Sequence, residues 1–164
     1  MRYRMAATSG AISGRARRMN NRYLYRAKRT DNGEWVEGYL LNIAKINAFI
    51  CTGKIKLDGT LKGIVAPEMY AVDPYTICQC TGLRDKSGKM IFEHEIVREC
   101  HSEYIGEVKF GEHGKGYGWY IEWISEKSHY YRVDFLYWQR EVSLEVIGNI
   151  FDNPELLQND EQEE

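Results

Sequence analysis

The stretch from Thr76 to Glu99 constrains the fold most, because two apolar runs flank a polar turn there. The run TICQCTGLR leads into Asp85-Lys86-Ser87-Gly88, and Met90-Ile91-Phe92 follows. Asp, Ser and Gly favour turns because they hydrogen-bond locally or accept positive φ angles. β-branched and aromatic residues on both sides favour extended backbone. The pattern predicts a strand, a turn and a second strand, with a further strand beginning at Ile96.

Three segments also carry a family resemblance. TGLRDKSGKMIFEHEIV (residues 81–97) resembles the signature of YopX-type proteins, which are small proteins common in bacteriophages and prophages. YLYRAKRTDNGEWVEGYL (23–40) resembles the opening hairpin of that family, and EVIGNIFDNPELL (145–157) resembles its closing strand and turn. One departure concerns His94, which stands where the family usually has Gly in Glu-Gly-Asp-Ile. The candidate family-motif residues are Thr81, Gly82, Leu83, Asp85, Gly88, Glu93, Glu95 and Ile96.

The expected fold class is mainly β. The resemblance implies an SH3-like barrel or roll in the C-terminal part, and it implies no established biochemical activity. The alternation from Tyr23 and the Asn32-Gly33 pair predict an N-terminal β-hairpin with a type I′ turn, whose central residues have positive φ angles. Asn153 as N-cap and Pro154 as first helical residue predict a short C-terminal helical turn.

The remaining strands are predicted from shorter apolar runs. Residues 42–75 are less legible, although 48–51 is expected to form a strand. Residues 111–118 hold four glycines and are predicted to be a loop. Further strands are expected at 104–110, 119–124, 129–136 and 145–150.

Charge is segregated along the chain. Of 22 basic and 24 acidic side chains, nine basic ones and no acidic one lie in residues 1–29. An acidic body repels phosphate, so the basic arm is the part suited to weak nucleic-acid binding. We expect residues 1–20 to be a disordered basic extension, 21–157 one YopX-like β domain, and 158–164 an acidic disordered tail. The resemblance begins beyond Met19, which makes Met19 an alternative start.

Three clusters of side chains are candidates for chemistry. Glu93, His94 and Glu95 could support acid–base chemistry in a small hydrolase, but a solvated turn whose acids accept backbone hydrogen bonds is the favoured interpretation. Cys78 and Cys80, with Cys100 and His101, lack the usual zinc spacing, so packing of reduced thiols is favoured. The glycine-rich segment lacks the helix that a phosphate loop requires. The sequence therefore predicts no catalytic residue, metal or cofactor.

Aromatic residues suggest a binding surface instead. If one face of strand 119–124 stays open, Tyr117, Tyr120, Tyr130 and Tyr131 form a candidate interaction surface; core packing or ordinary surface is the alternative. No apolar run is long enough to cross a bilayer. The favoured function is a non-enzymatic phage or prophage accessory protein in the host cytoplasm that binds a host or phage protein. The alternative is a nucleic-acid-associated factor using the Arg-rich arm and the aromatic strand, and a homo-oligomer is compatible with either.

Overall fold

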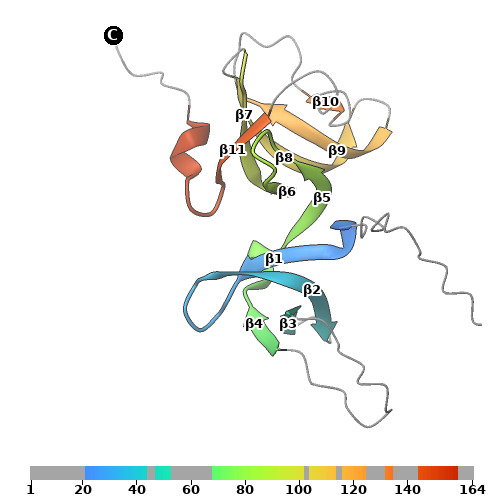
Figure 1. The fold of residues 1–164 in the computed structure, drawn as a ribbon, viewed down its shortest axis with the longest axis vertical. Helices are drawn as coiled ribbons and strands as arrows, with labels where there is room; N and C mark the ends of the chain where they lie inside the picture. The colour runs from blue at the N-terminus through green and yellow to red at the C-terminus, as the bar shows by residue number, and fades with distance from the viewer. Residues whose placement is uncertain are drawn as a thin grey trace, which may run out of the picture.

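The computed structural model describes residues 21–43, 47–52, 68–101, 104–113, 116–124, 132–134 and 144–158. These residues form a mainly β fold of two antiparallel sheets (Figure 1). The helical elements among them are short 3-10 turns, and no helix is long and apolar enough to cross a membrane. The predicted basic extension lies outside the described residues, as do Tyr130, Tyr131 and the tail beyond Gln158.

The first sheet has the strand order β4-β3-β2-β1-β5-β6 and is curled. Two contacts between the ends of β1 and β4 show the curl: Arg29 bridges Val72, and the amide of Asp73 donates to the carbonyl of Lys28 at 2.8 Å. The inner face buries Ala27, Ala48, Ile50 and Val72. The strands are β1 (Leu24–Lys28), β2 (Trp35–Ile43), β3 (Asn47–Thr52), β4 (Glu68–Val72), β5 (Cys78–Arg84) and β6 (Met90–Phe92).

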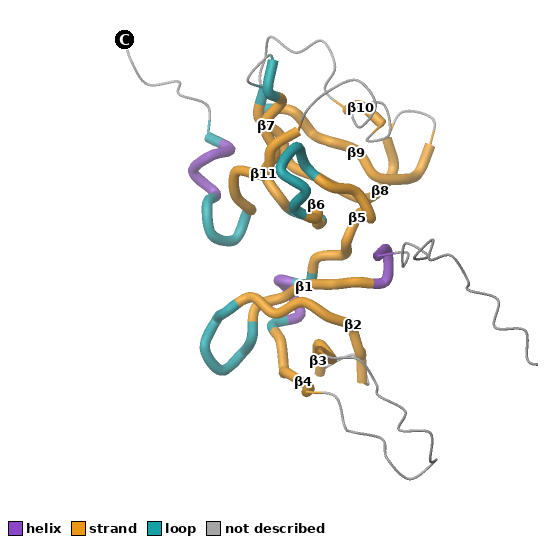
Figure 2. The backbone as a smooth tube through the Cα atoms, in the orientation of Figure 1, coloured by secondary structure: helices purple, strands orange, loops and turns teal. Residues whose placement is uncertain are grey.

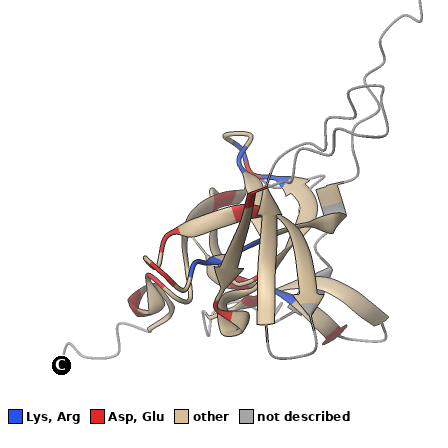
Figure 3. Ribbon diagram, turned by 90° about the horizontal axis from the view of Figure 1, so that it is seen from below, with Lys and Arg blue, Asp and Glu red and all other residues tan. Residues whose placement is uncertain are grey.

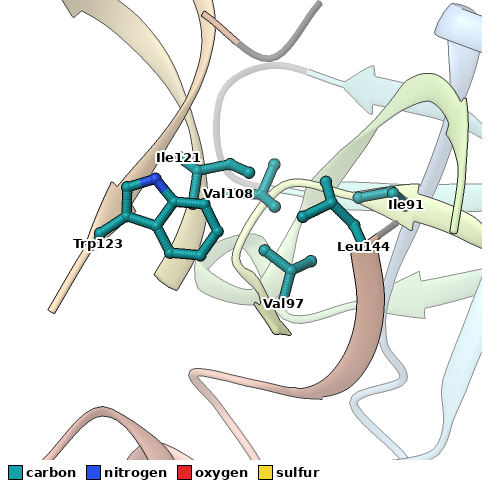
Figure 4. Close-up of a cluster of buried hydrophobic side chains, with 6 residues drawn as sticks. All are labelled: Ile91, Val97, Val108, Ile121, Trp123 and Leu144. Carbon is teal, nitrogen blue, oxygen red and sulfur yellow. The ribbon is translucent and has the colours of Figure 1, made fainter. Parts of the chain in front are cut away.

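The second sheet has the order β10-β9-β8-β7-β11. Its strands are β7 (Glu95–Glu99), β8 (Ile105–His113), β9 (Gly116–Trp123), β10 (Arg132–Asp134) and β11 (Leu144–Asn149). Residues of β7, β8, β9 and β11 and one residue of β6 point into a common core, where their side chains face one another (Figure 4). The buried members are Ile91, Val97, Val108, Ile121, Trp123 and Leu144.

Strand β5 connects the two sheets (Figure 2). Its first residues pair with β1, whereas its last residue, Arg84, pairs with Met90 of β6. Between these ends the register shifts at a bulge, and Gly82 within it has a φ of 81°. A bulge bends its strand, which lets one strand serve both layers. A third core at this junction contains Cys78, Cys80 and Phe92, with Leu24, Trp35, Met90 and Phe151 packed around them.

The predicted N-terminal hairpin is confirmed, but its turn type is wrong. The amide of Arg29 donates to the carbonyl of Glu34 at 2.9 Å, so four residues form the loop between β1 and β2. Gly33 has a positive φ of 73° and Asn32 does not. A type I′ turn needs positive φ at both central residues, so the Asn-Gly pair closes a longer loop here.

Two further expectations are corrected, and one strand was not predicted. The glycine-rich segment is mostly strand, because β8 extends to His113 and β9 begins at Gly116, with Gly111 opposite Gly118. Strand β4 lies in a region that the sequence left without pattern. The 3-10 turn η3 (Pro154–Leu157) has Asn153 at its N-cap position, but the Asn153 side chain makes no capping hydrogen bond.

Candidate interaction surface and the family motif

The polar turn of the family motif is built around the carboxylate of Asp85. Its Oδ1 accepts hydrogen bonds from the amide and hydroxyl of Ser87 at 2.8 and 2.7 Å and from the amide of Lys89 at 2.9 Å. Its Oδ2 accepts one from the amide of Val146 in β11 at 3.3 Å. Burial raises the pKa of Asp85, but these hydrogen bonds outweigh it and leave the pKa below its ordinary value. The turn thereby ties the β5–β6 hairpin to the second sheet.

The other motif residues have structural positions as well. Thr81 Oγ1 donates to the carbonyl of Ile91 at 2.8 Å and accepts the amide of Leu83 at 3.1 Å across the bulge. Gly82 and Gly88 have positive φ angles of 81° and 87°, which side-chain-bearing residues adopt at a cost. Leu83 packs against the core of the second sheet, and Ile96 is fully buried. These residues shape the hairpin that joins the sheets.

The centre of the joint is a buried ion pair between Arg26 of β1 and Glu95 of β7. Arg26 Nη1 lies 2.7 Å from Glu95 Oε1, and Glu95 Oε2 accepts the amide of Phe92 at 2.9 Å. The guanidinium also stacks 4.7 Å from the ring centroid of Trp35. Burial raises the pKa of Glu95, while the charge of Arg26 lowers it in part. The expectation that this acid sits in a solvated turn is therefore wrong.

The burial of Arg26 in this joint could not be predicted from the local sequence pattern. Both faces of β1 are covered, because one packs into the curled sheet and the other against the second layer. Arg26 stands on the second of these faces, opposite Cys78. An arginine alternating with apolar residues is typical of a half-exposed strand, so the pattern favoured a solvent-facing side chain.

His94 has a different environment from Glu95, whereas Glu93 interacts electrostatically with both His94 and Glu107. It occupies the turn between β6 and β7, and its Nδ1 lies 2.7 Å from Glu107 Oε1 of β8. The Glu95 carboxylate points to Arg26. Glu93 is half-buried, and this burial is the main reason that the pKa of Glu93 is raised. The proposed Glu93–His94–Glu95 triplet is thus divided between two environments.

The backbone at His94 explains the glycine of the family pattern, since its φ is 62°. We expect His94→Gly to be about 1 kcal/mol more stable than His94→Ala, because both lose the Glu107 contact but only alanine keeps a Cβ in the left-handed region. Urea unfolding of the two variants measures the difference. An alanine variant as stable as the glycine variant would mean that position 94 has relaxed out of this conformation.

Cys78 and Cys80 are buried at the junction of the sheets. The Cys78 thiol donates to the carbonyl of Thr76, with Sγ and O 3.3 Å apart, and burial raises its pKa to about 12. A thiol with this pKa is protonated at neutral pH and is a poor nucleophile or ligand. Within the described residues, no group of three or more His, Cys, Asp or Glu side chains could hold a metal ion.

The β8–β9 hairpin presents three aromatic side chains on one face. Tyr117 is 74% exposed, Phe110 is 44% exposed and Trp119 is half-buried. Phe110 pairs directly with Trp119 and lies 5.2 Å from Tyr117 and 4.9 Å from Trp119 between ring centroids. We call Phe110, Tyr117 and Trp119 the aromatic surface. Tyr117 was predicted, whereas Phe110 and Trp119 were missed because their relation depends on the strand register.

Tyr120 is not part of an open face. It is 8% exposed, and its ring stacks on that of His113 with centroids 5.1 Å apart. The strand carrying it is covered on both faces near its middle, because Ile121 is also buried. The expectation that Tyr120 forms part of an interaction surface is therefore corrected.

Among the described residues, the charges near the aromatic surface are acidic or paired. Glu112 stands opposite Tyr117, and the ammonium of Lys109 is paired with Glu122 and with Glu107. Figure 3 shows basic and acidic positions interspersed over the described ribbon. The described part of the surface around these rings therefore offers little to attract a phosphate.

The family model described as YopX protein matches residues 24–158. The chain belongs to the YopX family. The resemblance carried by its three sequence segments is thus confirmed. A solved relative, described as protein EF1440 from Enterococcus faecalis, has 26% identity over 82% of this chain and 96% of its own, with a TM-score of 0.43. No curated protein matches the chain.

Proposed function

We propose that this YopX-family chain is a non-enzymatic binding module that attaches to a host or phage protein through the aromatic surface. It would act in the cytoplasm of a bacterial host as a phage or prophage accessory protein. The second sheet, with the β5–β6 hairpin closing it, would be its SH3-like barrel. The exposed aromatic surface is the observation that carries this proposal.

The chemistry of the aromatic surface supports a protein partner. Large aromatic side chains with a polar tip, such as Tyr117, dominate the energetics of protein interfaces. Phe110 and Tyr117 stand next to Trp119, whose other contacts are in the core, so the exposed rings rest on a fixed base. A rigid aromatic cluster loses little conformational entropy on binding.

The engagement of the titratable groups supports a role without catalysis. Glu95 is bound by Arg26, and His94 is bound by Glu107. The family pattern has Gly at the position of His94, so an imidazole there is not required for whatever the family does. A catalytic cluster would instead have its groups converging on one reacting atom.

A nucleic-acid-associated role is the second candidate, favoured by the exposure of Tyr117. Aromatic rings can stack on bases without sequence preference. Base stacking is usually combined with a basic groove for the backbone, and Glu112 beside Tyr117 opposes this. Protein binding is therefore favoured.

Site-directed photocrosslinking in bacteria that carry the phage tests the proposal. A photoreactive phenylalanine at position 117 should give a crosslinked protein that survives nuclease treatment. The matched control has the same photoreactive residue at position 75. Tyr75 is also highly exposed, but it lies in the 3-10 turn between β4 and β5, outside the aromatic surface. Phe110→Ser with Tyr117→Ser should weaken binding of the identified protein by about 30-fold.

Two results would contradict the protein-partner proposal. One is equal crosslinking from positions 117 and 75. The other is single-stranded DNA or RNA binding that resists salt and depends on Tyr117, which would favour the second candidate. This test uses Tyr117 rather than Tyr120, because the Tyr120 side chain is buried.

A further inference from the structure

The outer face of the first sheet carries an apolar patch that the aromatic surface does not include. Directly paired residues in antiparallel strands share a face of the sheet. Tyr39 pairs with Cys51, and Cys51 pairs with Met69. One step along, Leu41 pairs with Phe49, and Phe49 pairs with Ala71. We call these two rows the outer patch: Tyr39, Cys51, Met69, Leu41, Phe49 and Ala71.

The outer patch is exposed to solvent, although its side chains are of the apolar kind that proteins usually bury. Tyr39 and Met69 are each 46% exposed and Leu41 is 41% exposed. The intervening residues Leu40 and Ile50 point the other way, into the inner core of the curled sheet. The exposed side chains are therefore not needed to fill that core, and contiguous apolar exposure of this kind marks an interaction site.

The patch continues a face that is already covered elsewhere. Leu24 pairs with Tyr39 across β1 and β2, so both point to the same side of the sheet. Leu24 packs against the junction core of Cys78, Cys80 and Phe92. One half of this face is thus covered by the second layer of the same molecule, and the outer patch is its uncovered continuation.

Charge limits the class of partner. None of the six side chains of the outer patch is acidic or basic. Glu37 stands at the margin, two residues before Tyr39 in β2, and is exposed. A phosphate, a metal ion or a strongly charged peptide finds no counter-charge among the six. The complement of such a surface is another uncharged apolar face.

We propose that the outer patch is a self-association surface that packs against the same patch of a second copy. Twofold symmetry supplies the complementary apolar face without a further partner, and it brings no like charges into the centre of the contact. The faces rather than the edges would meet, because the edge of β4 is engaged where the amide of Thr30 donates to the carbonyl of Ala71 at 3.0 Å. Six central side chains are few beside the roughly 20 residues a side of a standard interface, so the dimer is concentration-dependent.

Sedimentation velocity of the full chain over a wide concentration range tests this proposal. The wild type should pass from monomer to dimer with rising concentration. Leu41→Lys with Met69→Lys should raise the dissociation constant at least about 100-fold, because two buried charges would face their copies. The matched control, Tyr75→Lys, places a charge on a residue that is 90% exposed outside the patch and should leave the dimer unchanged.

The outcomes separate clearly. Circular dichroism first establishes that the lysine variant is folded, and Leu41→Ser with Met69→Ser serves as a second variant if it is not. A wild type that remains monomeric at the highest concentration overturns the proposal. A dimer that persists in the folded patch variants also overturns it, because the contact would then lie on another face. These variants leave Phe110 and Tyr117 intact, so the result is independent of partner binding at the aromatic surface.

Discussion

Arg26→Met should lower the free energy of unfolding by about 3 to 5 kcal/mol at pH 8, the largest loss that we expect from a single substitution at a motif contact. Methionine retains the apolar contacts of the arginine stem but leaves the buried Glu95 carboxylate without its closest cation. Lys89 Nζ, at 3.6 Å from Glu95 Oε1, remains as a weaker partner. Urea unfolding monitored by tryptophan fluorescence measures the loss.

The loss should be smaller at pH 5 than at pH 8. Burial raises the pKa of Glu95 in the folded protein, and removal of Arg26 takes away the interaction that lowers it. A carboxyl group whose folded pKa is raised binds its proton more tightly in the folded state, so stability falls as pH rises through that pKa. At pH 5 the variant can neutralise Glu95 and avoid part of the cost of an unpaired charge.

The double variant Arg26→Met with Glu95→Leu is the matched control. It removes the carboxylate together with the guanidinium, so we expect it to recover much of the stability lost in Arg26→Met. A double variant no more stable than the single one, or a loss that does not change with pH, would contradict the uncompensated carboxylate as the cause.

Gly38→Ala should destabilise the fold by about 3 kcal/mol. A methyl group at Gly38 would overlap the carbonyl oxygen of Cys51 and lie 2.8 Å from Ile50 Cγ2. Backbone atoms of β3 would have to move to make room, and the curl of the first sheet would open. Thermal unfolding of the variant measures the loss.

Gly118→Ala provides the control, since it is another strand glycine but has no atom within 4 Å of an added Cβ. Its stability should remain within about 0.5 kcal/mol of the wild type. Equal effects at Gly38 and Gly118 would show that lost backbone freedom, rather than close approach in the curled sheet, accounts for the cost.

Most strands of this fold could be predicted from local patterns. The runs before and after Asp85 form β5 and β6, and the Asn32-Gly33 pair lies in the loop of the first hairpin. These segments carry both turn residues and β-forming neighbours, so local preferences agree with the fold. Strand β4 was not predicted, and its place depends on pairing with β3.

Burial was harder to predict than strand position. Arg26 and Glu95 are far apart in sequence, and their pairing depends on how the two sheets pack. The aromatic surface has the same origin, because Phe110 and Trp119 meet through the β8–β9 register. Tyr120 was misassigned since strand alternation identifies two faces but not whether both are covered. Which of these side chains are buried and which are exposed therefore depends on long-range packing that local sequence patterns do not reveal.

We expect the family motif to join the two sheets into one cooperative unit, with Arg26 and Glu95 at the joint. Native-state hydrogen exchange of the wild type tests this claim most directly. The slowest amides of β3 in the first sheet and of β8 in the second should have the same free energy of opening and the same dependence on denaturant. If the β3 amides exchange through a separate, lower-energy opening while those of β8 stay protected, the two sheets unfold independently and the claim is wrong.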